Sequence, residues 1–298
     1  MIQPIEIELK DLSKSFKPFY KAMFARDSLS KANDFPTMVA RKQEFEFNRD
    51  HLYQYQAACR LATSPKIPIL YPHAFLGPAH LKVLTHDAFP LKLIGTVHRL
   101  NHILQIRPLK LGQPYQVELK IGTYRQRPSG FEFDLTTEIS HKSRVDWSSI
   151  STFLVRDKLK GDDETAAISE GLVNLEEEGE KLTEFKVPKT AGREFAKVTG
   201  DYNPIHISSV LAKGFGFKRD LVHGMWGLAK GISYINHLSH QEPMRLDVAF
   251  KGPLYMTDLV VVKQSSLDHG RFEFYSGKNP KPCVVGHLRK AQPTETLF

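Results

Sequence analysis

The 298-residue chain has only two cysteines, Cys59 and Cys283, and no long apolar run. Two such distant cysteines indicate neither a disulfide scaffold nor a thiolate metal site. No segment approaches the ~18 apolar residues of a membrane helix. The opening MIQPIEIELK carries acids where a secretory signal would carry a basic end and an apolar block. These absences exclude the membrane, secreted and collagenous classes, and they predict a cytoplasmic protein with reduced thiols.

What is present is the composition of a globular protein, with 41% hydrophobic and 25% charged residues. The length fits two domains of about 150 residues each. The net charge of +8 is uneven, because ten acids and three lysines between Asp157 and Glu184 give that stretch −7 and leave +15 elsewhere. This acidic stretch, residues 157–184, predicts an exposed linker between a first domain, residues 1–156, and a second, residues 185–298.

The basic remainder favours a polyanionic partner. Nucleic acid has no further support, because the chain lacks a block of lysine and arginine interleaved with aromatics and lacks zinc-finger spacing. A small phosphorylated ligand explains the positive charge equally well. Any single basic residue is explained as an ordinary solvated lysine on the surface. We therefore expect no nucleic acid and no membrane among the partners.

Two passages repeat about half a chain length apart: LQIRPLKLGQPYQVELKI at 104–121 and VAFKGPLYMTDLVVVK at 248–263. Aligning Pro108 with Pro253 gives an offset of 145. Two further strand-like segments correspond, 131–139 with 272–277 and 151–156 with 283–290. Each half therefore predicts a strand, a short helix, a long buried helix and three or four antiparallel strands. This order indicates an α+β domain whose sheet wraps the long helix.

Apolar spacing predicts the long helices. In the second half four residues form one helical stripe: Met225, Leu228, Ile232 and Ile235. A similar helix is expected between Tyr71 and Thr85. Three glycines lie together on the second-half helix: Gly224, Gly227 and Gly231. Because each glycine costs roughly 1 kcal/mol against alanine, they indicate close approach of the sheet or of a ligand, with a weak helix tolerated by packing as the alternative.

Most of the candidate chemistry lies in residues 195–231. Asp201 and His206 are five residues apart across Asn203-Pro204, where proline prevents a continuous helix. A bent loop of this kind can direct a carboxylate and an imidazole to one point. His206 is also expected to open a short helix that runs to Lys213.

Gly224 follows His223 at the expected start of the long helix, where backbone N–H groups have no helical partner and suit an anionic oxygen. An acid/base pair beside such a donor is the minimum for proton abstraction next to a carbonyl. Taken singly, Asp201 would be a turn or capping residue and His206 a helix cap.

The joint pattern resembles the MaoC-like family, the (R)-specific enoyl-CoA hydratases and 3-hydroxyacyl dehydratases of hot-dog fold. The resemblance rests on TGDYNPIH at 199–206, AKGFGF at 212–217 and LVHGM at 221–225. The first half resembles the degenerate N-terminal hot dog of two-domain members, through YPHAFLGPAHLKVL and GTVHRLNHILQIRPL. One departure is Asp220, where relatives often have proline.

The resemblance implies a double hot-dog fold of the α+β class, with two curved antiparallel sheets each wrapped round a long central helix and paired as one pseudo-dimer. It also implies the roles of six residues: Asp201 and His206 as the catalytic pair, the Gly224 amide as oxyanion donor, and Asn203, Thr199 and His223 in support. At the offset of 145 the counterparts of the pair are Gln56 and Leu61. The first half has therefore lost the pair, and one active site per chain is expected.

The implied reaction is reversible hydration of trans-2-enoyl thioesters to (R)-3-hydroxyacyl thioesters. No metal or redox cofactor is expected, and CoA or the phosphopantetheine of an acyl carrier protein acts as substrate carrier. Loss of the second site implies a wider acyl tunnel. The chain length, the carrier, the assignment of acid and base, and the choice between monomer and homodimer stay open.

Two alternatives remain. A hot-dog thioesterase also uses a carboxylate and a helix N-terminal amide, but such enzymes lack the Asp-x-Asn-Pro-x-His loop. A non-catalytic acyl-thioester-binding subunit would need no acid/base pair. The complete pair in one half and its absence from the other argue against this second alternative.

Overall fold

The computed structural model describes residues 3–9, 12, 35–91, 93, 96–127, 130–156, 172, 174–175, 179–235 and 243–297. Most of the expected acidic linker, residues 157–184, lies outside this description. Its last five residues lie in a strand, because β7 begins at Glu180. No helix in the described segments has both the length and the apolar character needed to cross a membrane.

The described residues of the first half form six strands and three helices. In chain order they are β1 (Ile5–Glu8), β2 (Met38–Phe45), α2 (Arg49–Ala58), α3 (Tyr71–Phe75), α4 (Gly77–Leu84), β3 (Thr96–Gln105), β4 (Tyr115–Arg127), β5 (Gly130–His141) and β6 (Arg144–Arg156). The second half follows the same plan. Its elements are β7 (Glu180–Lys186), α5 (Ala191–Thr199), the 3-10 helix η3 (Pro204–His206), α6 (Ser209–Gly214), α7 (Gly224–Ile232), β8 (Met244–Phe250), β9 (Leu259–Gln264), β10 (Arg271–Ser276) and β11 (Val284–Lys290).

All of these strands belong to one sheet, in the order β1-β2-β4-β5-β6-β3-β8-β11-β10-β9-β7. From the centre outwards, β3, β6, β5, β4 and β2 of the first half mirror β8, β11, β10, β9 and β7 of the second. This is the strand correspondence that the internal repeat predicted. The two sheets that we expected are joined into a single sheet, because β3 and β8 pair antiparallel.

The centre of the β3–β8 pairing lies at His102 and Asp247, which face each other with Nδ1 and Oδ1 2.7 Å apart. These residues are 145 positions apart, the offset that aligns Pro108 with Pro253. A residue that pairs with its own repeat counterpart lies on the symmetry axis. The pseudo-two-fold axis of the molecule therefore passes between His102 and Asp247.

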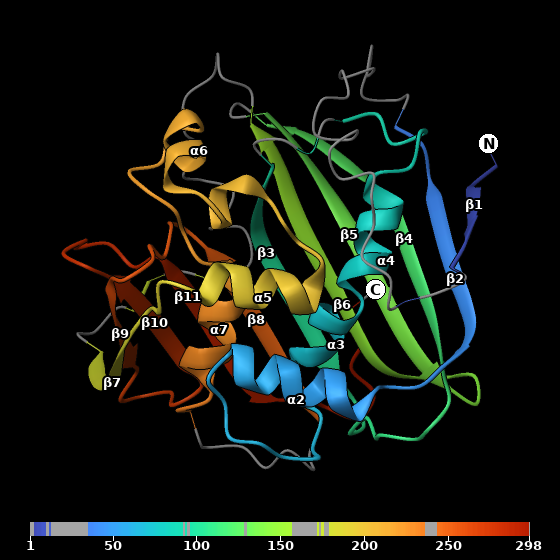
Figure 1. The fold of residues 1–298 in the computed structure, drawn as a ribbon. Coiled ribbons are helices and arrows are strands. Elements are labelled where there is room, and N and C mark those ends of the chain that lie inside the picture. The colour runs from blue at the N-terminus through green and yellow to red at the C-terminus, as the bar shows by residue number, and fades with distance from the viewer. Residues whose placement is uncertain are drawn as a thin grey trace.

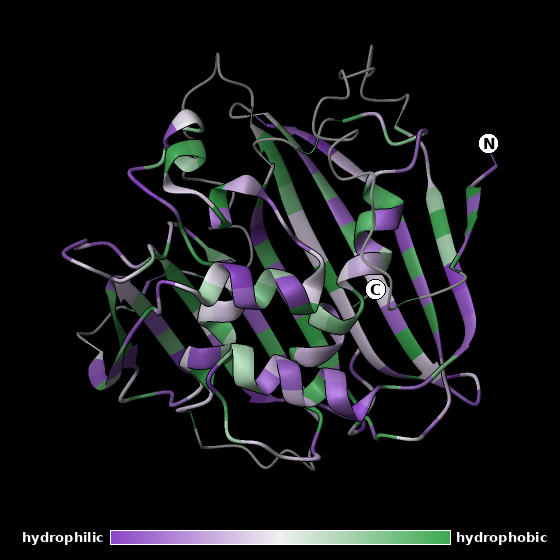
Figure 2. Cartoon of the chain, viewed as in Figure 1, coloured by the Kyte–Doolittle hydropathy of each residue, from purple (hydrophilic) through white to green (hydrophobic). Residues whose placement is uncertain are grey.

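The helices cover one face of the curved sheet, with the second half on one side of the β3–β8 seam and the first half on the other (Figure 1). Hydrophobic and hydrophilic residues alternate along the strands (Figure 2), as expected for a sheet with one face on the core. Helix α7 is largely apolar, and Trp226 and Leu228 are almost fully buried.

The glycines of α7 face the sheet closely, as the sequence predicted. A Cβ atom at Gly227 would lie 2.2 Å from Leu254 Cδ1, and one at Gly231 would lie 2.1 Å from Phe274 Cζ of β10. At Gly224 it would lie 2.8 Å from the Phe250 ring. Because these three glycines have no Cβ, the helix backbone can lie directly on the inner face of the sheet.

Three helix predictions need correction. The expected long helix between Tyr71 and Thr85 is two short helices, α3 and α4, that meet at Leu76. Proline lies in the first turn of each, where it is tolerated, and would disrupt a continuous helix. The second-half helix that we expected to be long, α7, has only nine residues, which is also the length of α5. His206 ends η3, and the following helix α6 begins only at Ser209, with the Ser208 side chain as its cap.

The helices of the two halves support each other. His51 of α2 donates an N–H from Nε2 to the Val198 carbonyl of α5, with the atoms 2.9 Å apart. The Trp226 indole N–H of α7 donates to the Ala58 carbonyl at 2.7 Å. At Gly77 a Cβ atom would overlap the Thr199 carbonyl oxygen. The end of α5, from which the loop with Asp201 begins, is thus held by the first half.

Candidate functional site

The loop after α5 places Asp201. Helix α5 ends at Gly200, whose φ of 75° lies in the left-handed region that glycine adopts without strain. The Thr199 hydroxyl donates to the Phe195 carbonyl at 3.0 Å and accepts the Asp201 N–H at 3.3 Å. Thr199 therefore anchors the turn, and the Asp201 side chain keeps 39% of its surface accessible.

The next turn is shaped by Asn203 and Pro204. The Asp201 carboxylate accepts the Asn203 N–H at 3.1 Å, and the Asn203 side chain accepts the Ile205 N–H at 3.3 Å. Asn203 thereby caps η3, whose first residue is Pro204. The single 3-10 turn reverses the chain and brings His206 back beside Asp201.

His206 is almost completely buried, and its tautomer follows from one contact. Its Nδ1 lies 2.8 Å from the Leu221 carbonyl oxygen, which can only accept, so Nδ1 carries the proton. In the neutral ring Nε2 then holds the lone pair. Burial, followed by the neighbouring His223, lowers the pKa of His206 to about 3. The imidazole is consequently neutral at physiological pH, with Nε2 available as a base.

His223 stacks on His206, with ring centroids 3.7 Å apart and 28° between planes. Its Nε2 donates to the Asp201 backbone carbonyl at 3.0 Å and lies 3.5 Å from the Asp201 carboxylate. Burial lowers the pKa of His223 as well. The Nδ1 atom is buried and has no hydrogen-bond partner among the described residues. His223 holds the Asp201 turn from the side of α7.

Gly224 is the first residue of α7, with His223 as the N-cap. No helical carbonyl precedes it, so its N–H is one of the free donors of the helix N-terminus. The Phe250 ring fills the space that a Cβ would need. Gly224 lines the same cavity as Asp201 and His206. The six residues singled out from the sequence are thus gathered at the meeting point of α5, η3 and α7.

Asp201, His206 and His223 each offer a ligand atom within 4.8 Å of the others, the one such group of three in the described part of the chain. The geometry does not suit one metal ion. One nitrogen of each ring donates to a backbone carbonyl. Lone pairs lie in the ring planes, and two stacked, nearly parallel rings cannot direct theirs to a common point ~2.0–2.1 Å from both. We derive no step through a metal at this site.

The site opens into a cavity of about 800 Å³ that both halves line. Second-half residues form the end with Asp201, His206 and Gly224. First-half side chains continue it with an apolar wall made of Leu81, Leu84, Leu93, Phe153 and Leu154. Lys251 and Lys281 also line it and are exposed, so the cavity meets solvent beside two positive charges.

The first half does not repeat the catalytic loop. Helix α2 is followed by Arg60 with a φ of 56°, as α5 is followed by Gly200, and these two residues are 140 positions apart. At an offset of 140 the counterparts of Asp201 and His206 are Leu61 and Lys66, and at 145 they are Gln56 and Leu61. None is acidic or a histidine. Gln56 closes its own loop through two hydrogen bonds with the Ser64 backbone.

Three cavity residues were missed by the sequence analysis: His73, His80 and His98. All come from the first half, on α3, α4 and β3. They lie in the segments that carried the weaker resemblance, YPHAFLGPAHLKVL and GTVHRLNHILQIRPL. Their spacing of seven and eighteen residues follows no known motif, so only the tertiary structure brings the three rings together.

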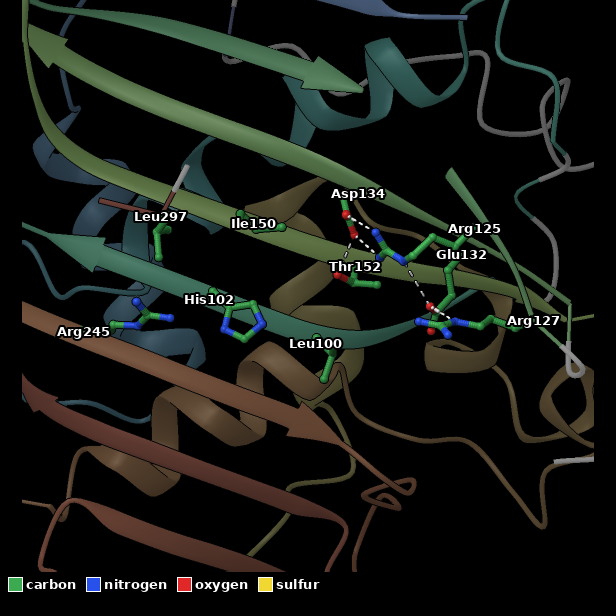
Figure 3. Close-up of a pocket in the computed structure, with 10 residues that line it drawn as sticks. All are labelled: Leu100, His102, Arg125, Arg127, Glu132, Asp134, Ile150, Thr152, Arg245 and Leu297. Carbon is green, nitrogen blue, oxygen red and sulfur yellow. Dashed lines mark hydrogen bonds and ion pairs between the residues drawn. The ribbon is translucent and has the colours of Figure 1, made fainter. Parts of the chain in front are cut away.

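A second hollow, of about 380 Å³, lies on the other face of the sheet (Figure 3). Side chains alternate along a strand, so His102 and Leu100 point away from the core that Ile103 enters. The charged residues there pair mainly with one another. Arg125 binds Asp134 through two hydrogen bonds, and Arg127 binds the buried Glu132. These arginines and carboxylates of the hollow are therefore engaged in ion pairs with one another.

Known proteins resemble this chain in sequence and in fold. Residues 174–266 match the family model described as the MaoC like domain. The 3-hydroxyacyl-thioester dehydratase X of Mycobacterium tuberculosis is 27% identical over 228 residues, which is 76% of this chain and 79% of the relative.

Solved structures show the fold. The crystal structure of HtdX from Mycobacterium tuberculosis has a TM-score of 0.72 at 23% identity, covering 85% of this chain and 100% of that chain. The MaoC-like dehydratase from Phytophthora capsici has a TM-score of 0.64 at 15% identity, covering 88% and 98%. Both matches span the two halves together, so the double hot-dog fold predicted from the sequence is confirmed. Residues 174–266 therefore match a MaoC like domain, the chain as a whole has the fold of MaoC-like dehydratases, and its named relative is a dehydratase, which is a hydro-lyase.

Proposed function

We propose that the protein catalyses the reversible dehydration of (R)-3-hydroxyacyl thioesters to trans-2-enoyl thioesters at the Asp201–His206 site. One observation carries the proposal: a neutral imidazole of defined tautomer lies beside a carboxylate and a helix N-terminal amide in one cavity. The named activity of the Mycobacterium tuberculosis relative supports the substrate class.

His206 is the proton carrier. Its Nδ1–H is committed to the Leu221 carbonyl, so Nε2 takes the proton from C2 of the hydroxyacyl thioester. The Leu221 carbonyl then stabilises the imidazolium, because it accepts from the other nitrogen. The imidazolium next gives this proton to the hydroxyl on C3 as the C3–O bond breaks. Water leaves, and His206 returns to its neutral form.

The Gly224 amide stabilises the enolate. As the C2–H bond breaks, negative charge gathers on the thioester oxygen, which this N–H and the positive end of the α7 dipole face. A donor positioned in advance at such an oxygen is worth roughly 3 kcal/mol or more in the transition state. Position 224 also has to be glycine for packing, because the Phe250 ring fills the space that a Cβ would need.

Asp201 holds the leaving hydroxyl. A carboxylate accepts hydrogen bonds only, so it orients the C3 hydroxyl and the product water for proton transfer from His206. Asn203, Thr199 and His223 maintain its position through the contacts described above. They support the turn and take no part in proton transfer.

The carrier enters beside Lys251 and Lys281. A pantetheine arm reaches from solvent to the thioester position, and the diphosphate of CoA lies near these two positive charges. The same lysines suit an acidic carrier protein. Activity on CoA thioesters and on carrier-protein thioesters, measured in the wild type and in K251A/K281A, distinguishes the two carriers. If the double variant loses activity on CoA thioesters alone, the lysines bind the nucleotide part of CoA.

The test is an assay of trans-2-enoyl-CoA hydration with the wild type, D201N and H206Q. General acid–base groups contribute about 10²–10⁴-fold, so we expect each variant to lose at least about a hundredfold in kcat/KM. Proton exchange separates their roles. With a saturated acyl-CoA in D2O, D201N retains exchange at C2 and H206Q loses it.

H141Q serves as control, because His141 bonds the Pro114 carbonyl far from the cavity. Release of free CoA instead of hydration would assign the protein to the thioesterases. A folded D201N and H206Q with wild-type rates would leave the non-catalytic binding subunit as the explanation.

A further inference from the structure

Three histidines of the first half form a cluster in the cavity of the candidate site. The ring centroids of His73 and His80 are 5.0 Å apart, and those of His73 and His98 are 5.6 Å apart with the rings stacked. His80 is buried, while His73 and His98 are partly accessible where they line the cavity. The proposed reaction uses none of them, so their presence needs another explanation.

The cluster lines the same cavity as Asp201, His206 and Gly224. The His98 ring packs on Phe250 at 5.1 Å, and Phe250 is the side chain that fills the space beside Gly224. His73 is close enough to Asp201 to feel the charge of its carboxylate. An acyl chain that starts at Gly224 and Asp201 and continues into the first half therefore runs past these three rings.

The imidazoles are uncharged. Burial lowers the pKa of His73 to about 4 and the pKa values of His80 and His98 well below the ordinary value. A neutral imidazole offers one N–H donor and one acceptor nitrogen. The cluster thus presents hydrogen-bonding groups without net charge, which suits a neutral oxygen and does not attract a carboxylate or a phosphate.

Protein partners satisfy these groups only in part. His80 Nε2 is 3.3 Å from the Thr137 hydroxyl. The Asn101 amide donates to His98 Nε2 at 3.3 Å, and the His98 ring also hydrogen-bonds the Leu100 backbone. The Nδ1 atom of His73 is buried without a hydrogen-bond partner among the described residues. A buried polar group left unpaired costs free energy. The surrounding wall of leucine and phenylalanine side chains cannot supply the missing partner.

We propose that His73, His80 and His98 form a subsite for an acyl chain that bears a hydroxyl or keto oxygen beyond C3, and that the buried Thr137 positions His80 from behind. The inference rests on the proposed function, since it assigns the substrate class of the same site. A plain alkyl chain would cover these polar groups without pairing them, whereas a neutral oxygen at that depth pairs with an imidazole. The first half lost the catalytic pair and in its place supplies substrate selectivity.

The experiment measures kcat/KM for matched trans-2-enoyl-CoA substrates of one chain length, either unsubstituted or with one hydroxyl at successive positions from C5 to the chain end. We expect the wild type to prefer the hydroxylated chain by about tenfold at one or two adjacent positions, the size of one added hydrogen bond. Equal or lower kcat/KM for the hydroxylated chain at every position would overturn the subsite.

Variants then assign the preference to the cluster. In H80L and in the nearly isosteric T137V, the ratio of hydroxylated to plain kcat/KM should fall towards one. H141L is the matched control and should keep the wild-type ratio. Retention of the ratio in a folded T137V and a folded H80L would contradict the assignment. Thermal melting establishes folding, and the wild-type substrate comparison tests the subsite even where H80L does not fold.

The two proposals fail separately. A wild type that hydrates neither chain rejects the proposed function and the subsite with it. A wild type that hydrates both chains equally well keeps the proposed function and rejects the subsite alone.

Discussion

His206 shows how one backbone contact can fix the tautomer of a buried imidazole. The Leu221 carbonyl takes the Nδ1 proton, and burial beside His223 keeps the ring uncharged. An exposed histidine would be partly protonated near pH 6.5 and would lose its base in that range. In this site the base form persists well below neutrality, so the proposed chemistry is insensitive to the ordinary titration of histidine.

The pH dependence of kcat/KM tests this point. In the proposed reaction the neutral form of His206 is the active one, and its pKa of about 3 lies below the ordinary 6.5. Lowering the pH through 6.5 should therefore leave kcat/KM unchanged. The decrease in kcat/KM should begin only below about pH 5 and should follow a single protonation, that of His206. Hydration rates in overlapping buffers from pH 4.5 to 8 provide the measurement. An inflection near 6.5 would show that the base titrates as an exposed histidine and contradict the assignment.

Helix α7 shows what a run of glycines achieves at the scale of an element. Each added Cβ would overlap Phe250, Leu254 or Phe274, so the helix can lie on the sheet only because the side chains are missing. The loss in helix propensity is offset by burial of Trp226, Leu228 and the facing sheet residues. This close contact also fixes where the N-terminus of α7 meets the cavity.

Substituting two glycines by alanine separates packing from propensity. In G231A the new methyl group meets the Phe274 ring at 2.1 Å, and we expect a loss of about 1–3 kcal/mol in the free energy of unfolding. G214A is the control at the end of α6, because its Cβ would meet nothing within 4 Å. It should be neutral or stabilise by up to about 1 kcal/mol. Urea unfolding measures both, and equal effects would contradict the packing explanation.

At the scale of the whole molecule, the two halves have diverged into different tasks around one pseudo-two-fold axis. The second half carries the proposed reacting groups, and the first half supports α5 through His51 and completes the cavity. Five histidines line this cavity: His73, His80, His98, His206 and His223. Their pKa values are all lowered, with burial as the main cause.

These histidines make the fold sensitive to acid. Their pKa values are lower in the folded than in the unfolded chain, so between the folded values and about 6.5 the unfolded chain binds more protons. The contribution of these neutral histidines to the free energy of unfolding is therefore fully present above about pH 6.5. It falls as the pH drops below that value, by up to about 1.4 kcal/mol per pH unit for each histidine. Urea unfolding from pH 4.5 to 8 should show a smaller slope in H80Q than in the wild type. Identical slopes below pH 6.5 would contradict a neutral buried His80.

Much of the site follows from local sequence. Pro204 forbids a helix across the loop, Asn203 caps the turn that follows, and Gly200 permits the left-handed end of α5, so the spacing alone predicts that Asp201 and His206 approach each other. The offset of 145 predicts the strand correspondence and the lack of a second catalytic pair. These features depend on residues close in sequence or on a repeated pattern, which a single chain displays directly.

Other features depend on contacts between distant segments, which the sequence does not display. The pairing of β3 with β8 joins two expected sheets into one, since edge strands pair according to their shape and exposure once folded. The tautomer of His206 depends on a carbonyl fifteen residues away. The histidine cluster depends on α3, α4 and β3 converging on one cavity. The sequence by itself thus determined the reactive loop and the repeat, and only the tertiary structure decided what surrounds the substrate, because burial and partner geometry arise from packing.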